Sequence, residues 1–167
     1  TLGIVGLGEV GQAVARRAAG FGMKVLAWNR TPRSVPGVEA VELDDLLAAS
    51  DFVSINIALG EETRNLIDER RLALMKRDAV LVNTSRGGIV DELALADALS
   101  HDRLAAAGLD VFEREPVPED HPLLSLPNVV ATPHIGSATE ATRIKMADMA
   151  AMNMLAALKD EPMPHCV

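Results

Sequence analysis

The sequence predicts an α/β fold in which helices cover both faces of a doubly wound parallel sheet. Two observations support this prediction. Short apolar runs of strand length alternate with helical patterns, which is typical of a parallel sheet with crossover helices. The chain has 167 residues, 49% hydrophobic and 24% charged, which is enough to bury the core of one globular domain. We therefore expect residues 1–167 to form a single domain.

Each expected element follows from the length and periodicity of an apolar segment. Ser137 and Glu140 have the spacing of a capping box, so the last and longest helix should begin near Ser137. The 113–128 segment contains four prolines and is expected to be a long loop. Strands are expected at 2–5, 24–28, 38–42, 52–57, 79–83, 104–109 and 129–131, and the earlier helices at 10–20, 44–50 and 91–100.

The composition excludes several classes of function. A net charge of −8 leaves no broad basic face for nucleic acid or acidic lipid, and no apolar run approaches the length of a membrane span. A single cysteine, Cys166, excludes an intrachain disulfide framework, is interpreted as an incidental thiol and fits a reducing, cytoplasmic compartment. No cluster has the spacing of metal ligands, so no metal is expected. No secretory signal is recognised at the start of the sequence. Because the sequence starts with Thr1 and not with Met, we expect it to come from a longer protein.

Gly6, Gly8 and Gly11 form a G-x-G-x-x-G pattern between the first predicted strand and the first predicted helix. In this context the pattern is that of the phosphate-binding turn of a Rossmann fold. Gly6 permits the tight turn, Gly8 lets a pyrophosphate approach the backbone, and Gly11 lets helix and strand pack closely. The predicted helix from Val10 offers free N–H groups to an anion, and Glu9 and Val10 are expected among the cofactor contacts. The pattern predicts a bound dinucleotide; the alternative is a glycine-rich turn without a ligand.

The end of the second predicted strand bears on which dinucleotide is bound. Rossmann folds that bind NAD usually place a carboxylate there, whereas this chain has the neutral Asn29 and Thr31 with Arg30 and Arg33. Arginine can bind a 2′-phosphate through several N–H groups, which a carboxylate would repel. We therefore predict NADP as the cofactor. The alternative is an NAD site beside which Arg30 is only a solvated charge.

Three polar residues follow strand-like runs and are candidates for catalysis: Arg86, Glu115 and His134. They lie in the stretches NTSRGG at 83–88, GLDVFEREP at 108–116 and PHIGSAT at 133–139. With the glycine turn, these stretches make the chain resemble the nucleotide-binding domain of the D-isomer-specific 2-hydroxyacid dehydrogenase family. The 29–31 stretch most resembles the NADP-using glyoxylate and hydroxypyruvate reductases of that family. One departure is Ala58, where the family often has proline.

The resemblance implies a role for each candidate. Arg86 would bind the substrate carboxylate and polarise its carbonyl, and His134 would exchange the proton because imidazole titrates near neutral pH. Glu115 would orient the His134 ring and favour its protonated form; Glu113 is the near decoy for Glu115. Further cofactor contacts are implied at Ile57, Ala58, Thr84, Ser85, Asp110 and Gly136, together with Arg86 and His134.

The resemblance also implies what surrounds this chain in the whole protein. An N-terminal substrate-side domain is missing here, and the family forms dimers through the nucleotide-binding domain, so a homodimer is expected. The leading expectation is reduction of a small 2-keto acid with NADPH. Two alternatives stay open: an NAD-dependent enzyme for another D-2-hydroxy acid, and a nucleotide-sensing module like the corepressors that share the fold. His121 is interpreted as a loop or interface residue.

Overall fold

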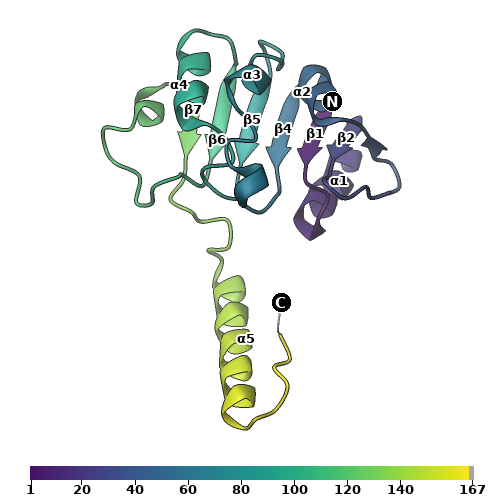
Figure 1. Ribbon diagram of the computed structural model, residues 1–167, viewed down its shortest axis with the longest axis vertical. Helices are drawn as coiled ribbons and strands as arrows, with labels where there is room; N and C mark the ends of the chain where they lie inside the picture. The colour runs from purple at the N-terminus through teal and green to yellow at the C-terminus, as the bar shows by residue number, and fades with distance from the viewer. Residues whose placement is uncertain (166–167) are drawn as a thin grey trace. The chain divides into compact units, whose positions relative to one another are not determined.

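The computed structural model describes residues 1–165 and divides into two compact units, Thr1–Pro133 and His134–Val167. Within the described residues, the first unit contains one seven-stranded sheet in which every neighbouring pair is parallel (Figure 1). The strand order is β3-β2-β1-β4-β5-β6-β7. The strands are β1 (Leu2–Val5), β2 (Val25–Trp28), β3 (Glu39–Ala40), β4 (Phe52–Ile55), β5 (Val80–Asn83), β6 (Ala106–Leu109) and β7 (Val129–Ala131).

This order confirms the predicted doubly wound sheet. The chain builds outward from β1 to β3 and then returns past β1 to add β4 to β7 on the other side. Helices of the first unit are α1 (Glu9–Gly20), α2 (Leu43–Ala49), α3 (Glu69–Leu72) and α4 (Glu92–Ser100), with short 3₁₀ helices η1 (Glu61–Thr63) and η2 (Pro122–Ser125).

The core lies in two layers on opposite faces of the sheet. On one face, Leu2 and Ile4 of β1 pack with Ala15 and Ala18 of α1. On the other face, Val5 of β1 belongs to a larger cluster with buried leucines of α2, α3 and α4. Adjacent residues of a strand point to opposite faces, so β1 contributes to both layers. Helices therefore cover both faces, as the sequence predicts.

Several boundaries differ from those predicted. The third strand is only Glu39–Ala40, and the fourth ends at Ile55, so residues 56–57 belong to the loop that follows it. The first helix begins at Glu9 and the second at Leu43. Asp91 caps α4 as predicted, since its side chain accepts from Leu93 N and Ala94 N, and the helix runs from Glu92 to Ser100. α3 and η1 are absent from the predictions, because elements of three or four residues are too short to show a helical period. The 113–128 segment is not entirely loop, since it contains η2.

The second unit contains α5 (Glu140–Leu158). The predicted capping box at Ser137 is wrong: the N-cap is Thr139, whose Oγ1 accepts from Thr142 N at 3.2 Å. The preceding residues form a turn instead, in which Ala138 N donates to Ile135 O at 2.9 Å. Cys166 lies outside the described residues. None of the helices within residues 1–165 combines the length and apolar character needed to cross a membrane.

Candidate functional site

Two neighbouring clefts open at the carboxyl ends of the strands, next to the neighbouring strands β1 and β4. After these two strands the strand order reverses direction. The larger has a volume of about 710 Å³ and is bordered by Gly8 and by residues after β2. The smaller, of about 460 Å³, is bordered by Val10, Thr84, Ser85 and Arg86. Both share the 56–59 loop as a wall. Such a switch point is where open α/β sheets bind ligands, and two adjoining clefts suit an extended ligand.

The glycine turn contains two glycines that the fold itself requires. Gly6 has φ +100°, and a Cβ there would lie 2.3 Å from Ile57 Cγ2. A Cβ on Gly11 would lie 2.0 Å from Gly6 O, so this glycine lets α1 pack against the turn. Both positions are therefore closed to any side chain by contacts within the chain.

Gly8 is different, because neither packing nor backbone conformation requires it. As the N-cap of α1 it has φ −73°, which any residue can adopt, and a Cβ there meets nothing within 4 Å. A side chain at this position would instead stand over the free N–H groups at the start of α1. Glycine here keeps the helix N-terminus open to an anion that approaches the backbone, and a dinucleotide pyrophosphate fits this requirement.

The other residues predicted to contact the cofactor near the turn lie at the start of α1 and in the loop after β4. Glu9 begins α1 and is exposed, and the 63% exposed Val10 follows it on the wall of the smaller cleft. Ile57 and Ala58 line both clefts. Because Ala58 is exposed, the chain can hold alanine at the position where the family often has proline without a change in core packing.

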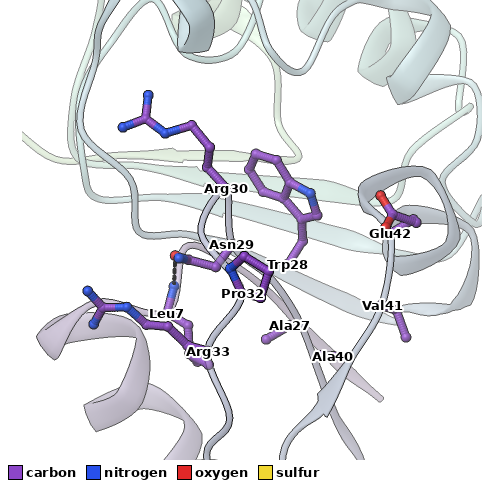
Figure 2. A pocket seen from close by; sticks show the side chains of 10 residues that line it. All are labelled: Leu7, Ala27, Trp28, Asn29, Arg30, Pro32, Arg33, Ala40, Val41 and Glu42. Atoms are coloured by element: carbon purple, nitrogen blue, oxygen red, sulfur yellow. Dashed lines mark hydrogen bonds between the residues drawn. The ribbon is translucent and has the colours of Figure 1, made fainter.

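The turn after β2 is fastened to the glycine turn by Asn29. Its Oδ1 accepts from Leu7 N at 2.9 Å (Figure 2). Its Nδ2 donates to Thr31 O at 2.5 Å. A third cavity of about 540 Å³ adjoins this turn, and Arg30 and Arg33 border both it and the 710 Å³ cleft. In Figure 2 both guanidinium groups extend to the side of Asn29 away from Glu42. Two cations thus stand at the edge of the cleft.

Arg30 has a partner that the sequence analysis did not foresee. Its Nη1 lies 2.6 Å from Glu62 Oε2, and both side chains are about three-quarters exposed, at 75% and 73%. Glu62 belongs to η1 and borders the same cleft, so the ion pair spans its rim. Exposed pairs of this kind contribute little to stability. The contact holds Arg30 over the cleft while leaving its guanidinium accessible.

The loop after β5 carries Thr84, Ser85 and Arg86 and is organised by the buried Asn83. Asn83 Oδ1 accepts from Ser85 N at 3.1 Å and from Ser85 Oγ at 2.9 Å. Its Nδ2 donates to Arg86 O at 2.9 Å. The sequence analysis missed this residue, although an asparagine at the end of a strand is a recognisable signal for a side-chain-stabilised turn. Asn83 therefore sets the path of the backbone that presents Arg86.

The structure brings the loops of Arg86 and Glu115 together. Gly87 packs so closely that a Cβ would lie 1.9 Å from Phe112 C, on the peptide bond between Phe112 and Glu113. Phe112 N in turn donates to Glu115 Oε1 at 3.0 Å. Glycine at position 87 is thus required for the turn that carries Glu115 to lie against the loop that carries Arg86.

Asp110 is the other predicted residue of this region and is 5% exposed at the end of β6. It accepts from Thr132 Oγ1 at 2.5 Å, which ties it to the chain that leaves β7. His134 and Gly136 belong to the second unit. His134 has φ +54°, in the left-handed region that histidine enters more readily than most residues.

The chain matches, over residues 1–136, the sequence profile of a family described as D-isomer specific 2-hydroxyacid dehydrogenase, NAD binding domain. This match covers well over half of the chain. The chain belongs to this dehydrogenase family. Its strand order and glycine turn are those of a dinucleotide-binding domain, and the resemblance noted in the sequence is thereby confirmed.

Curated members of the dehydrogenase family align with the whole chain. A glyoxylate reductase of Korarchaeum cryptofilum is 53% identical over 171 residues, which are 100% of this chain and 52% of that protein. A glyoxylate/hydroxypyruvate reductase B of Serratia proteamaculans is 48% identical over 172 residues, with 100% and 53% covered. The chain therefore spans about half the length of the curated relatives it matches.

Solved structures of the dehydrogenase family share the fold and include both cofactor types. A D-isomer specific 2-hydroxyacid dehydrogenase from Xanthobacter autotrophicus Py2, in complex with NADPH and MES, has a TM-score of 0.85 and 38% identity; 99% of this chain and 69% of that chain are covered. D-lactate dehydrogenase with NAD+ from Lactobacillus jensenii has a TM-score of 0.91 and 32% identity, covering 99% and 55%. Family membership thus supports a nicotinamide cofactor without deciding between its two forms.

The histidines outside the proposed site divide into exposed and partly buried residues. His101 is exposed and contacts Asp97 on α4. His121 lies in the loop before η2, as predicted, and its side chain is only 15% exposed and contacts Glu92 at 3.1 Å. Within residues 1–165, His, Cys, Asp and Glu side chains do not gather in groups of three or more that could hold a metal ion.

Proposed function

We propose that this chain is the cofactor-binding half of a reductase that transfers a hydride from NADPH to a small 2-keto acid, such as glyoxylate or hydroxypyruvate. The observation that carries the proposal is Gly8, a glycine required by neither packing nor conformation at the open N-terminus of α1. The two curated relatives named above, glyoxylate reductases that align with the entire chain, support the choice of substrate class. The missing half supplies the substrate-side domain.

The proposed preference for NADPH depends on the turn after β2. A 2′-phosphate on the adenosine ribose carries negative charge and hydrogen-bond acceptors, which the guanidinium groups of Arg30 and Arg33 complement. Both arginines border the 710 Å³ cleft, and no carboxylate occupies positions 29–31. Asn29 and Thr31 bind the neighbouring ribose hydroxyls. The glycine turn, with Gly6, Gly8, Glu9, Val10 and Gly11, holds the pyrophosphate.

An NAD-dependent enzyme for another D-2-hydroxy acid is the second candidate, and one observation favours it. Glu62 pairs with Arg30 at 2.6 Å, and its carboxylate would oppose a 2′-phosphate at the same rim. The NAD-bound relative from Lactobacillus jensenii has the same fold. The comparison of the two cofactors described below separates the candidates.

The substrate is held and protonated by three residues of this chain. Arg86 binds the carboxylate of the 2-keto acid and polarises its carbonyl through its planar, permanently charged guanidinium group. His134 donates a proton to the carbonyl oxygen as it becomes a hydroxyl, and Glu115 holds the imidazole in the orientation that does so. The bound nicotinamide supplies the hydride. Ile57, Ala58, Thr84 and Ser85 would hold the cofactor, Asp110 would lie by the nicotinamide amide, and Gly136 would be nearby.

The decisive experiment measures turnover by the complete protein. With NADPH and a panel of 2-keto acids, we expect glyoxylate or hydroxypyruvate to be reduced, with kcat/KM higher for NADPH than for NADH. Arg30→Ala should raise the KM for NADPH and leave that for NADH nearly unchanged, because the 2′-phosphate is its target. A clear preference of the wild type for NADH would refute the proposed cofactor and favour the second candidate.

The roles of the two catalytic side chains are tested separately. His134→Ala and Arg86→Gln should lower kcat/KM for the keto acid by at least about 100-fold, while the Kd for NADPH changes little. The chain 1–167 by itself should bind NADPH and show no normal turnover, since it lacks the substrate-side domain. Equal specific activity of this chain and the complete protein would refute the assignment as half of an enzyme.

We also propose that the enzyme is a cytoplasmic homodimer. The single cysteine fits a reducing compartment, and dimer formation through the nucleotide-binding domain is implied by the family resemblance. Light scattering of the complete protein should give twice the monomer mass. A monomer at high concentration would contradict the proposal.

A further inference from the structure

Glu92 and His121 form a partly buried pair beside the turn that carries Glu115. Their side chains are only 13% and 15% exposed, and His121 Nε2 lies 3.1 Å from Glu92 Oε2. The Phe112 ring packs against His121, with ring centroids 5.8 Å apart and an interplanar angle of 75°. Neither residue borders the clefts described above, so the proposed reaction does not explain the pair.

The hydrogen bonds of His121 define how it meets Glu92. Leu123 N donates to His121 Nδ1 at 3.4 Å, so His121 caps η2 through that nitrogen. In the neutral ring, a nitrogen that accepts leaves the proton on the other nitrogen. Nε2–H therefore donates to the Glu92 carboxylate, and the pair joins η2 to the first turn of α4.

Glu92 has a second partner, which connects the pair to the proposed site. Glu113 N donates to Glu92 Oε1 at 2.6 Å. Gly87 contacts the same peptide bond, because a Cβ there would lie 2.3 Å from Glu113 N and 1.9 Å from Phe112 C. The peptide between Phe112 and Glu113 is thus held by Glu92 and packed against the residue that follows Arg86. On the other side of the Phe112 Cα, in the preceding peptide, Phe112 N donates to Glu115 Oε1 at 3.0 Å.

Burial of the Glu92 carboxylate is energetically unfavourable by itself. Desolvation raises the pKa of Glu92, and the nearby Glu113 carboxylate raises it further, whereas the bonds from Glu113 N and His121 lower it. Glu113 is itself paired with Arg64 at 2.7 Å. Because burial opposes the charged form, the bonds from Glu113 N and His121 are what hold the Glu92 carboxylate beside the 112–113 peptide, and this geometry points to a positioning role.

We infer that Glu92 is a positioning residue for the proposed reductase and that His121 holds Glu92 in place. Glu92 holds the 112–115 turn so that the Glu115 carboxylate can orient the His134 imidazole, as proposed above. The inference rests on the proposed function. It assigns to Glu92 and His121 no contact with substrate or cofactor. They act through the 112–113 peptide, and a displacement of that peptide shifts Phe112, whose N–H holds Glu115 Oε1.

The first test compares Glu92→Ala with wild type in the complete enzyme. We expect kcat for keto-acid reduction to fall about 10- to 100-fold, the effect of a small misplacement of a catalytic group, while the Kd for NADPH stays within about twofold. The pH at which kcat falls to half should also move downward, because a displaced Glu115 no longer favours the protonated imidazole. A purely structural role would not change the pH profile.

Variants of His121 separate its two bonds. His121→Gln can still donate to the Glu92 carboxylate and should keep most of the activity. His121→Asn can still accept from Leu123 N, but its shorter side chain does not reach Glu92, and it should resemble Glu92→Ala. The matched control is Glu113→Gln, which removes an exposed ion pair from the same turn and should leave kcat and the pH profile unchanged. Equal kcat and pH profile in Glu92→Ala and wild type would overturn the inference.

A second measurement needs no enzymatic activity. Hydrogen exchange of chain 1–167 should show faster exchange at the Phe112 and Glu113 amides in Glu92→Ala than in Glu113→Gln, with the β5 and β6 amides unchanged. Equal protection in both variants would overturn the inference regardless of turnover. If the wild-type enzyme reduces no 2-keto acid, the proposed function fails, and the exchange result still decides whether Glu92 holds the turn.

Discussion

Gly6 and Gly11 are required by close contacts within the chain, whereas Gly8 is not. Gly8 can therefore be substituted without disturbing the fold. Gly8→Ala should leave the Tm almost unchanged, because the position has φ −73° and open space around a Cβ. It should raise the Kd for NADPH about tenfold or more, since the methyl group stands where a pyrophosphate approaches the backbone. Fluorescence titration of chain 1–167 measures this. Gly20→Ala, equally free of contacts at the far end of α1, is the control. An unchanged Kd in Gly8→Ala would contradict the proposed site.

Glu62 offers a second test at the residue scale. Glu62→Gln removes the carboxylate that pairs with Arg30 and frees the guanidinium for a 2′-phosphate. Exposed ion pairs are worth less than about 1 kcal/mol, so the Kd for NADPH should fall by only about two- to fivefold. The Kd for NADH should not change. Glu61→Gln removes the same charge from the preceding position of η1 and serves as the control. Weaker NADPH binding in Glu62→Gln would argue against Arg30 as the phosphate ligand.

At the scale of elements, the contact between α2 and α3 depends on pH. Hydrogen bonds from Arg70 and Arg71 lower the pKa of Asp44 to about 2. In the unfolded chain the pKa of aspartate is about 3.9. The contact therefore stabilises the fold above that pH, and this stabilisation is lost as the pH falls toward 2. Asp44→Asn should therefore lower the Tm at pH 6, and its difference from wild type should shrink between pH 4 and pH 2.

The control for this prediction is Asp45→Asn, which removes the same charge from the same turn of α2 and leaves the Asp44 contacts intact. Scanning calorimetry of both variants over the pH range measures the effect. If the Tm of Asp44→Asn tracks that of wild type at every pH, the ion pairs do not contribute. A pH-independent difference would show that the loss arises from another cause.

For the molecule as a whole, stability should depend on the middle of the sheet. Leu81 of β5 is fully buried and belongs to the larger core cluster. Leu81→Ala should reduce the free energy of unfolding by about 2–5 kcal/mol, as expected for a cavity in a core. Val130→Ala on β7, where the side chain is 69% exposed, should change it by less than about 0.5 kcal/mol. Urea titration of both variants provides the comparison, and equal losses would contradict this description of the core.

The sequence alone determined the parallel sheet, the glycine turn after β1 and the family, because apolar periodicity and glycine spacing are local properties of the chain. Local patterns did not predict Thr139 as the N-cap of α5 or the four-residue helix α3.

Only the tertiary structure decided which side chains meet. Glu62 beside Arg30, and Glu92 between His121 and the Glu115 turn, have no signature of their own. Their partners become neighbours when the strand ends are brought to one edge of the sheet. Periodicity records which residues are buried, and the packing of distant segments determines what each buried polar group contacts.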